Sequence, residues 1–271
     1  MNNLEIKPYY QPPEYHTPAT LRRPLFYRLL PWPGPAFYLS MVYSVLVGRR
    51  RAAQGRLDLR EWGAISVMCG RMAEWCGGRL HLTGLDHLCA QPGAAVIIGN
   101  HMSTLETFLL PGIILPAKPL AFVVKESLLR HPFFGPVMRG TPAIAVSRRN
   151  PREDLVAVLE GGTEKLKACY SMCICPQSTR CFEFHEDKFN TLGVKLARRA
   201  GVQVIPMAVK TDFWSNGKWL KEIGPIRPKQ DVHIAFGPPL PPDLSQAELH
   251  GRVVAFVRSH LKSWGVPCNP P

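Results

Sequence analysis

The sequence lacks a cysteine framework. Its eight cysteines form no C-x-x-C pair, and no cysteine–histidine cluster has the spacing of a zinc finger. Cys173 and Cys175 lie in an apolar run, where a free thiol behaves as a small hydrophobic group. These features argue against a fold stabilised by disulfide bonds, predict no metal site and indicate a reducing compartment.

The chain also lacks a secretion signal and a long uninterrupted apolar run. Its first residues are polar and rich in proline, unlike a signal peptide. Residues 25–47 are strongly apolar and aromatic, but Pro31, Pro33 and Pro35 break this segment. About twelve clean apolar residues are left, whereas a membrane span needs roughly twenty. With the arginines at 49–51, the pattern favours an interfacial or re-entrant helix whose basic edge meets anionic headgroups; the alternative is a buried amphipathic helix that caps the core.

Acidic residues are scarce relative to basic ones. The 271 residues include 33 Lys and Arg against 20 Asp and Glu, which gives a net charge of +13 and a pI near 9.6. This charge suits an anionic partner such as a lipid, a phosphorylated cofactor or a nucleic acid. The sequence contains no C₂H₂ finger and no aromatic RNA-binding signature, so we rank nucleic acid last and expect no nucleic-acid partner.

From about residue 80 the chain alternates between short apolar runs and amphipathic segments. This alternation predicts an α/β fold with a mixed, mostly parallel sheet flanked by helices. We expect strands at 79–83, 94–99, 120–124, 143–147, 171–175, 202–209 and 232–236, and helices at 60–77, 103–115, 151–169, 191–200 and 245–264. The resulting division is an irregular arm (1–24), N-terminal helices at a membrane interface (25–78) and an α/β domain (79–271).

The most informative short segment contains His101 and Glu106. A buried strand is predicted to end just before His101, and a helix is predicted to begin near Ser103, which is a good N-cap residue. Positions five apart on one helix diverge by roughly 140°, so the two side chains meet only if His101 lies in the loop before the helix. A carboxylate on one ring nitrogen then leaves the other nitrogen free to remove a proton from a hydroxyl.

The same residues also match a structural motif. Ser103-x-x-Glu106 fits a capping box, in which Glu106 reaches back to a backbone N–H at the start of the helix. The sequence by itself leaves the catalytic and the capping interpretations both open.

Three further segments end predicted strands with polar or basic residues. They cover residues 122–129, 140–148 and 175–180, and they place Lys125, Arg148 and Arg180 at or near strand ends. In open α/β sheets these ends meet at the ligand-binding crevice. Guanidinium groups match phosphate oxygens well, so Arg148 and Arg180 are the favoured phosphate ligands. The alternative for each is an ordinary solvent-exposed charge.

In order and spacing, these segments resemble the glycerophospholipid acyltransferases of the 1-acylglycerol-3-phosphate type. The family's N-H-x4-D block corresponds to Asn100, His101 and, in place of Asp, Glu106. Its strand-and-Arg block corresponds to 144–148, its F-P-E-G-T-R block to 175–180, and its apolar V-P strand to 204–209. The resemblance covers roughly residues 80–240 and makes 79–271 the expected acyltransferase domain.

The resemblance implies a reaction and a set of roles. An acyl group moves from acyl-CoA or acyl-carrier protein to a hydroxyl of a lysophospholipid, with no bound cofactor. His101 deprotonates the hydroxyl and Glu106 orients the imidazole, which agrees with the absence of a G-x-S-x-G nucleophile elbow. The enzyme is expected on the cytoplasmic side of a membrane, as a peripheral or monotopic protein. The expected substrate-binding residues are Arg148, Thr179, Arg180, Ser178, Gln177 and Lys125.

Two departures from the family pattern keep other functions open. Glu106 replaces Asp, and Gln177 and Ser178 replace the Glu and Gly of the third block. The altered block allows a different lipid acceptor, such as an acylated amino acid or a glycolipid. A third hypothesis is a catalytically silent lipid-binding member, although such a protein is expected to lose the His or the acid that this chain keeps.

Overall fold

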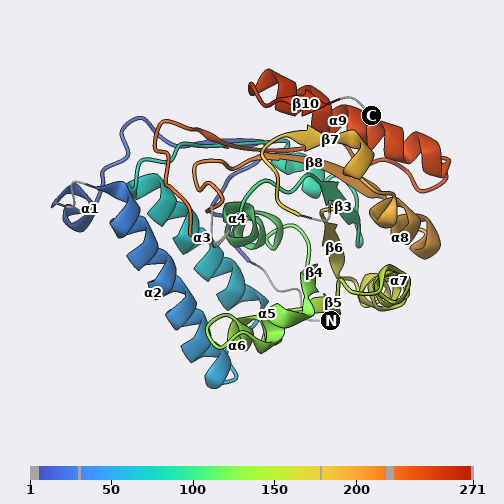
Figure 1. Ribbon diagram of the computed structural model, residues 1–271, viewed down its shortest axis with the longest axis horizontal. Helices are drawn as coiled ribbons and strands as arrows, with labels where there is room; N and C mark the ends of the chain where they lie inside the picture. The colour runs from blue at the N-terminus through green and yellow to red at the C-terminus, as the bar shows by residue number, and fades with distance from the viewer. Residues whose placement is uncertain (1–5, 30–31, 178, 218–222, 270–271) are drawn as a thin grey trace.

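The protein is built around one large twisted sheet (Figure 1). The computed structural model describes residues 6–29, 32–177, 179–217 and 223–269. In these residues eight strands form a sheet in the order β1-β2-β9-β8-β3-β6-β4-β5. Their bounds, in that order, are Glu14–His16, Leu80–Thr83, Val232–Phe236, Val204–Lys210, Val96–Gly99, Ser171–Ile174, Leu120–Lys125 and Ala143–Val146.

Five neighbouring strands of this sheet, from β8 to β5, run parallel. Strand β9 pairs antiparallel with β8 and parallel with β2, and β1 pairs antiparallel with β2. All residues of β3, β6 and β8 are buried, as expected for parallel strands that are covered on both faces. The predicted α/β fold with a mixed, mostly parallel sheet is confirmed.

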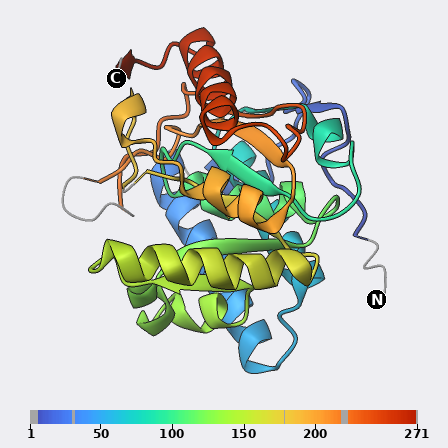
Figure 2. The ribbon, with the colours of Figure 1, turned by 90° about the vertical axis from the view of Figure 1, so that its right-hand side faces the viewer.

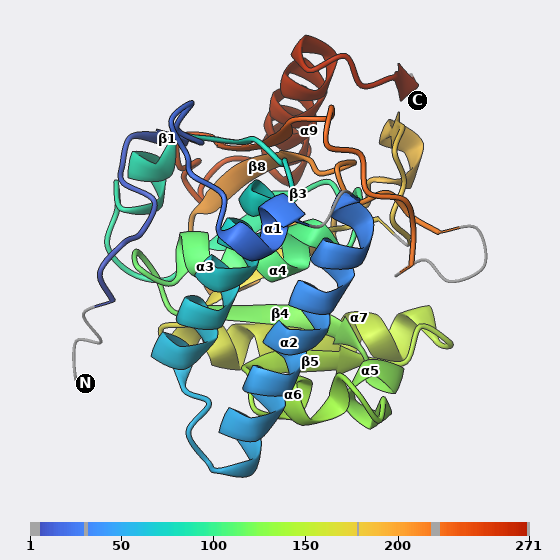
Figure 3. The ribbon, with the colours of Figure 1, turned by 90° about the vertical axis from the view of Figure 1, so that its left-hand side faces the viewer.

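Helices cover both faces of the sheet. Figure 2 shows α7, α8 and α9 over one face, and Figure 3 shows α2, α3 and α4 over the other. The bounds of the α-helices are α1 Leu25–Leu29, α2 Pro33–Ala53, α3 Leu59–Trp75, α4 Leu105–Ile114, α5 Glu126–Arg130, α6 Gly135–Arg139, α7 Pro151–Lys167, α8 Leu192–Ala200 and α9 Gln246–Ser263. Short 3₁₀ turns cover Leu85–Leu88 and Glu186–Lys188, and β7 (Phe184–His185) pairs with β10 (Cys268–Asn269).

The long helices begin at residues whose chemistry favours a helix start. The Asp58 side chain accepts from the backbone N–H of Glu61 at α3, and Ser245 accepts from Glu248 at α9. These caps satisfy backbone donors that have no partner inside the helix. They explain why the predicted starts of both helices lie within a residue of the observed ones.

The N-terminal segment differs from the prediction in one respect. Pro33 is the first residue of α2, and the whole helix of 21 residues runs without a break. Proline is favoured at the first helical position because its missing N–H has no partner there and its φ suits the helix. Pro33 and Pro35 therefore begin a helix where we expected an interruption; Pro31 lies outside the described residues.

The arm, expected to be irregular, contains strand β1. Tyr15 OH and Thr17 Oγ1 donate to Glu74 Oε1 of α3 at 2.8 Å and 2.5 Å. Tyr10 is buried against the same helix and contacts the core. These partners lie about sixty residues away in sequence, so local periodicity does not reveal them.

Candidate active site

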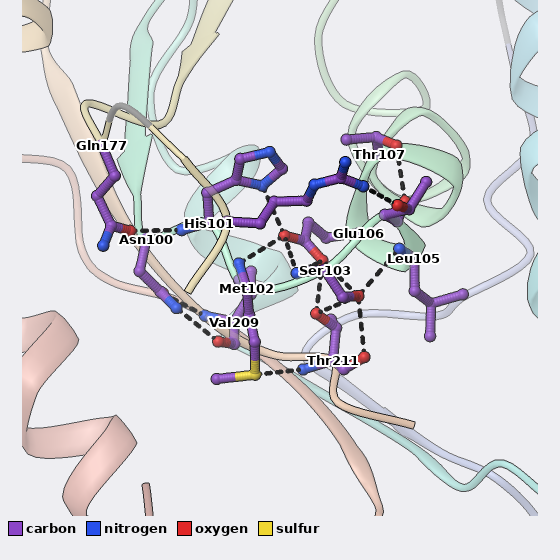
Figure 4. Close-up of polar contacts among 12 residues, drawn as sticks. Asn100, His101, Met102, Ser103, Leu105, Glu106, Thr107, Gln177, Val209 and Thr211 are labelled. Atoms are coloured by element: carbon purple, nitrogen blue, oxygen red, sulfur yellow. Dashed lines mark hydrogen bonds and ion pairs between the residues drawn. The ribbon is translucent and has the colours of Figure 1, made fainter. Parts of the chain in front are cut away.

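His101 and Glu106 meet at the end of β3 (Figure 4). His101 lies in the loop between β3 and α4, and its Nδ1 is 2.7 Å from Glu106 Oε1 in the first turn of α4. With Nδ1–H donating a hydrogen bond to Glu106, the second ring nitrogen, Nε2, keeps its lone pair. The fold-back that the sequence required for contact is present.

Glu106 is fully buried and surrounded by donors. Besides His101, its carboxylate accepts from the backbone N–H groups of Met102 and Ser103, at 2.8 Å and 2.9 Å. The hydroxyls of Ser103 and Thr211 also donate to Oε2, at 3.1 Å and 2.5 Å. A buried carboxylate is stable only when it is paired and hydrogen-bonded in this way.

The catalytic and the capping interpretations of Glu106 are therefore compatible. Glu106 accepts from the Ser103 N–H, as a capping box requires, while the same carboxylate holds His101. The helix begins slightly later than predicted, at Leu105, and Ser103 Oγ accepts from the Leu105 N–H at 3.0 Å. One side chain fixes both the helix start and the imidazole.

Two opposing effects set the pKa values of this pair. Burial lowers the pKa of His101, but the hydrogen bond and charge of Glu106 outweigh it and raise the value above normal. Burial raises the pKa of Glu106, but His101 and Thr211 more than offset it, so this pKa is lowered. Both shifts favour an imidazolium–carboxylate pair, which is the form produced when His101 takes a proton.

The loop that carries His101 is fixed by two amide side chains. The Asn100 side chain both donates to Val209 O and accepts from Val209 N, at 2.8 Å each, which ties the end of β3 to β8. Gln177 Oε1 accepts from the His101 N–H at 2.7 Å. Gln177 therefore positions the His101 backbone and does not face the cavity described next.

A cavity of about 520 Å³ opens beside His101. Its walls come from α2, α3, β4, α6 and the ends of β3 and β5, and much of its lining is apolar. The apolar lining includes Val45, Trp62, Ile65, Phe108, Phe122 and Val137. A pocket of this volume is typical of small-molecule sites.

Most of the predicted substrate-binding residues line this cavity. Lys125, Arg148, Thr179 and Arg180 are in its wall with His101. Ser178 lies outside the described residues. The structure thus places the hydroxyl and cationic groups of these four residues, called the cationic rim below, in the same cavity wall as the imidazole.

Arg148 is held in an unusual backbone conformation. Its φ is +58°, in the left-handed region that costs a non-glycine residue about 1–3 kcal/mol. Asp154 of α7 stabilises the turn by accepting from the Ser147 N–H at 2.8 Å and the Arg148 N–H at 2.7 Å. Arg180 is fixed from its side chain, because Nη1 donates to Thr104 Oγ1.

Sequence reasoning missed Thr211 and Asp154. Thr211 directly follows β8 and lies more than a hundred residues from Glu106 in the sequence. Asp154 has the sequence position of an ordinary acidic residue in the first turn of a helix. The only local signal for Thr211 was its place after the apolar strand of the fourth block. Its contact with Glu106 depends on β8 lying beside β3.

Comparison with known proteins shows which families and sequences this chain is similar to. Residues 79–210 match the family model described as acyltransferase. The 1-acyl-sn-glycerol-3-phosphate acyltransferase of Pseudomonas aeruginosa is 29% identical over 255 residues, which cover 92% of this chain and 90% of that protein. Over most of its length this chain is therefore similar to 1-acyl-sn-glycerol-3-phosphate acyltransferases, and residues 79–210 match an acyltransferase model. The acyltransferase of the same name from Escherichia coli is 28% identical over 64% of this chain and 71% of its own length.

The fold of this acyltransferase also resembles a solved structure. The crystal structure of the 1-acyl-sn-glycerophosphate acyltransferase PlsC from Thermotoga maritima superimposes with a TM-score of 0.62. The match covers 88% of this chain and 97% of that one at 20% identity. The family match confirms that the protein is an acyltransferase of the glycerophospholipid type, as the four ordered sequence blocks predicted.

Proposed function

We propose that this acyltransferase moves an acyl group from acyl-CoA or acyl-carrier protein to the free hydroxyl of a 1-acylglycerol-3-phosphate. The observation that carries the proposal is the His101–Glu106 pair at 2.7 Å, placed on the wall of an apolar cavity with a cationic rim. The printed names of the relatives from Pseudomonas aeruginosa and Escherichia coli support the choice of acceptor.

In the proposed mechanism His101 is the general base. Its Nε2 takes the proton of the acceptor hydroxyl while Glu106 stabilises the imidazolium through Nδ1. The resulting alkoxide attacks the thioester carbonyl, a C–O bond forms, and the C–S bond breaks. The imidazolium then returns its proton to the leaving thiolate, which restores neutral His101.

The cavity wall supplies separate places for the two ends of the substrates. Arg148, Arg180 and Thr179 would hold phosphate oxygens, with Lys125 as a further cation at the rim. The apolar residues from α2, α3 and β4 would take a fatty acyl chain. This division brings a hydroxyl and a thioester together at His101.

The replacement of the family's Glu by Gln177 is compatible with this acceptor. Gln177 uses its side-chain oxygen to accept from the His101 backbone, and a Glu carboxylate has the same ability. The substitution removes a negative charge from behind the loop and leaves the cationic rim intact. The altered block thus gives no reason to prefer another lipid acceptor.

The decisive test is a transfer assay with the purified full chain. Acyl-CoA and acyl-carrier protein serve as donors, and the acceptors are 1-acylglycerol-3-phosphate, other lysophospholipids, a glycolipid and an N-acylated amino acid. We expect acylation of 1-acylglycerol-3-phosphate at the highest kcat/KM. Preferred transfer to the amino-acid or glycolipid acceptor would replace our acceptor, and no transfer to any acceptor would favour a lipid-binding protein.

Thr211 offers a test of how Glu106 is held. Thr211→Val keeps the shape of the side chain but removes a hydroxyl that lowers the pKa of Glu106. Losing this hydrogen bond costs about 1–1.5 kcal/mol, so kcat should fall about tenfold while KM changes little. Thr211→Ser, which retains the hydroxyl, should keep most of the activity. A stability loss in urea unfolding with unchanged kcat would show that the contact only supports the fold.

We further propose that α1 and α2 bind the surface of a membrane. Leu39, Val42, Tyr43 and Leu46 are each at least 42% exposed and form an i, i+3, i+4, i+7 stripe on α2. The opposite face of α2, including Phe37 and Met41, is buried in the protein, so packing on α3 does not account for this stripe. Exposed apolar side chains continue into α1 and the start of α2 at Leu25, Phe26, Leu29 and Trp32.

This surface suits insertion into one leaflet. Among the helices of the described residues, none has the length and apolar character needed to cross a membrane. Arg50 is exposed in the last turn of α2, where it can meet anionic headgroups beside the inserted stripe, whereas Arg51 pairs with Glu61 at 3.2 Å. Because CoA thioesters and acyl-carrier protein are cytoplasmic donors, we place the enzyme on the cytoplasmic leaflet as a peripheral or monotopic protein.

A charge substitution in the stripe should release the protein from membranes. Each Leu buried in the bilayer contributes about 1.5–3 kcal/mol to the free energy of membrane binding. The double variant Leu39→Glu/Leu46→Glu should therefore weaken vesicle binding roughly 100-fold or more, and the single variant Leu46→Glu by the share of one leucine. Flotation with vesicles that contain an anionic phospholipid measures this effect. Val156→Glu, at an exposed apolar position on α7, is the control for Leu46→Glu and should bind like the wild type. Equal flotation of Leu46→Glu and Val156→Glu would argue against the proposed surface.

A further inference from the structure

A row of histidines crosses the edge of the sheet opposite β5. In the strand register His16 of β1 pairs with His81 of β2, His81 pairs with His233 of β9, and His233 pairs with Lys210 of β8. Side chains at paired positions lie on the same face of a sheet. Three imidazoles are therefore side by side, and no residue of β1, β2 or β9 lines the proposed acyl-transfer cavity.

Asp231 completes a cluster of candidate ligands. It lies two residues before His233, so both side chains point to one side of the chain. One ligand atom each from His81, Asp231 and His233 lies within 4.8 Å of the others. The His81 Nε2 atom is buried, lies 3.4 Å from Asp231 Oδ2, and makes no hydrogen bond in the described part of the chain.

The contacts made by the rings of His81 and His16 call for three N–H groups, whereas two neutral imidazoles carry only two. His16 Nδ1 lies 2.8 Å from His81 Nδ1, and His16 Nε2 lies 3.5 Å from Glu14 Oε2. With the Asp231 contact there are three places for a proton, but each neutral imidazole carries only one N–H. A ring lone pair therefore faces a carboxylate unless one ring is protonated or a cation lies between the ring and the carboxylate.

We propose that His81, Asp231 and His233 bind a divalent transition-metal ion such as Zn²⁺. Two imidazoles and one carboxylate form a donor set that zinc commonly takes, with solvent at the fourth position, whereas Mg²⁺ and Ca²⁺ prefer all-oxygen sites. His81 Nε2 would bind the ion, and its Nδ1–H would donate to His16. Metal-bound histidines almost always make such an outer hydrogen bond.

The surroundings of the cluster are compatible with a bound cation. Lys210 is a nearby positive charge, but its Nζ is 2.8 Å from Asp212 Oδ1 in a buried ion pair. In the described part of the chain, the Asp231 carboxylate contacts the His81 ring, and the Lys210 ammonium lies 3.4 Å from the Asp231 backbone carbonyl.

Metal binding requires the two rings to leave their stacked arrangement. His233 stacks on His81 at a centroid distance of 4.8 Å and on Trp264 at 5.0 Å. Two ligand atoms of a tetrahedral zinc ion lie only about 3.4 Å apart, so the rings must tilt toward the ion. This movement changes the environment of the Trp264 indole, which gives binding a fluorescence signal.

The test uses the full chain purified without a histidine tag and stripped of metal with a chelator. Zn²⁺ is added in competition with a chromophoric chelator. We expect one equivalent of Zn²⁺ per chain and a change in tryptophan fluorescence that Trp264→Phe removes. His81→Ala and His233→Ala should each weaken binding at least about 100-fold, and His16→Ala about 10-fold or more.

Two further variants make the result decisive. His131→Gln removes an exposed histidine far from the cluster in sequence and should bind Zn²⁺ like the wild type. Asp231→Asn keeps the size of its side chain and removes one ligand, so it tests the site even if an alanine variant fails to fold. Less than one equivalent bound, or wild-type affinity in both His233→Ala and Asp231→Asn, would overturn the proposal.

Discussion

His101→Ala should lower kcat for acyl transfer by about 10²–10⁴-fold, the usual contribution of a positioned general base. The imidazole lines the cavity and is held through Nδ1 by Glu106, so its removal takes away the proton acceptor of the proposed mechanism. KM for both substrates should change little, because the cationic rim and the apolar wall are untouched. Steady-state assays with acyl-CoA and 1-acylglycerol-3-phosphate measure both constants.

The His101 variant should still fold. The Glu106 carboxylate keeps its bonds from the Met102 and Ser103 N–H groups and from the Thr211 hydroxyl. Circular dichroism and thermal unfolding check this point. His131→Gln is the control, because His131 is exposed and does not line the cavity. Transfer at the wild-type rate by folded His101→Ala would rule out the proposed mechanism.

Glu106→Gln should lower kcat by a similar factor, about 10²–10⁴-fold, for an electrostatic reason. A neutral amide cannot stabilise the imidazolium, and its NH₂ group meets the donors that now point at Glu106. Glu106→Asp keeps the charge and moves the carboxylate by about 1.5 Å, so it should retain activity within about tenfold of the wild type. A Glu106→Gln enzyme that is active and only less stable would make the carboxylate a helix cap alone.

The pH profile separates these two roles of Glu106. His101 acts only when neutral, and Glu106 raises its pKa, so activity should fall as the pH decreases through a value above about 6.5. In Glu106→Gln the charge that raises the pKa of His101 is lost, while the burial that lowers this pKa stays. The fall in activity on the acidic side of the profile, the acidic limb, should therefore move to lower pH. A purely structural carboxylate would leave the limb in place. The measurement is kcat/KM against pH for the wild type and both variants.

The active-site pair was predictable because its two residues are close in sequence. An apolar run that ends at His101, a helix-start signal at Ser103 and an acid at Glu106 were enough to predict the fold-back. The same applies to the buried parallel strands, whose short apolar runs predicted positions close to those observed. Only the choice between a capping box and a catalytic pair was open, and the structure shows one carboxylate making both contacts.

Contacts between distant segments were not predictable in the same way. Thr211 reaches Glu106, 105 residues away, because β8 lies next to β3. The arm joins the sheet because β1 pairs with β2, and Tyr15 and Thr17 donate to Glu74 of α3. None of these residues carries a local pattern that specifies its partner.

The sequence by itself therefore determined the α/β class, the basic charge, the acyltransferase blocks and the pairing of His101 with Glu106. The tertiary structure decided how the rim residues gather at one cavity, which face of α2 is exposed, and how His81, Asp231 and His233 come together. The physical reason is that periodicity and capping act over a few residues. Strand order and register, in contrast, are set by burial of the whole sheet and bring together residues that are far apart in the chain.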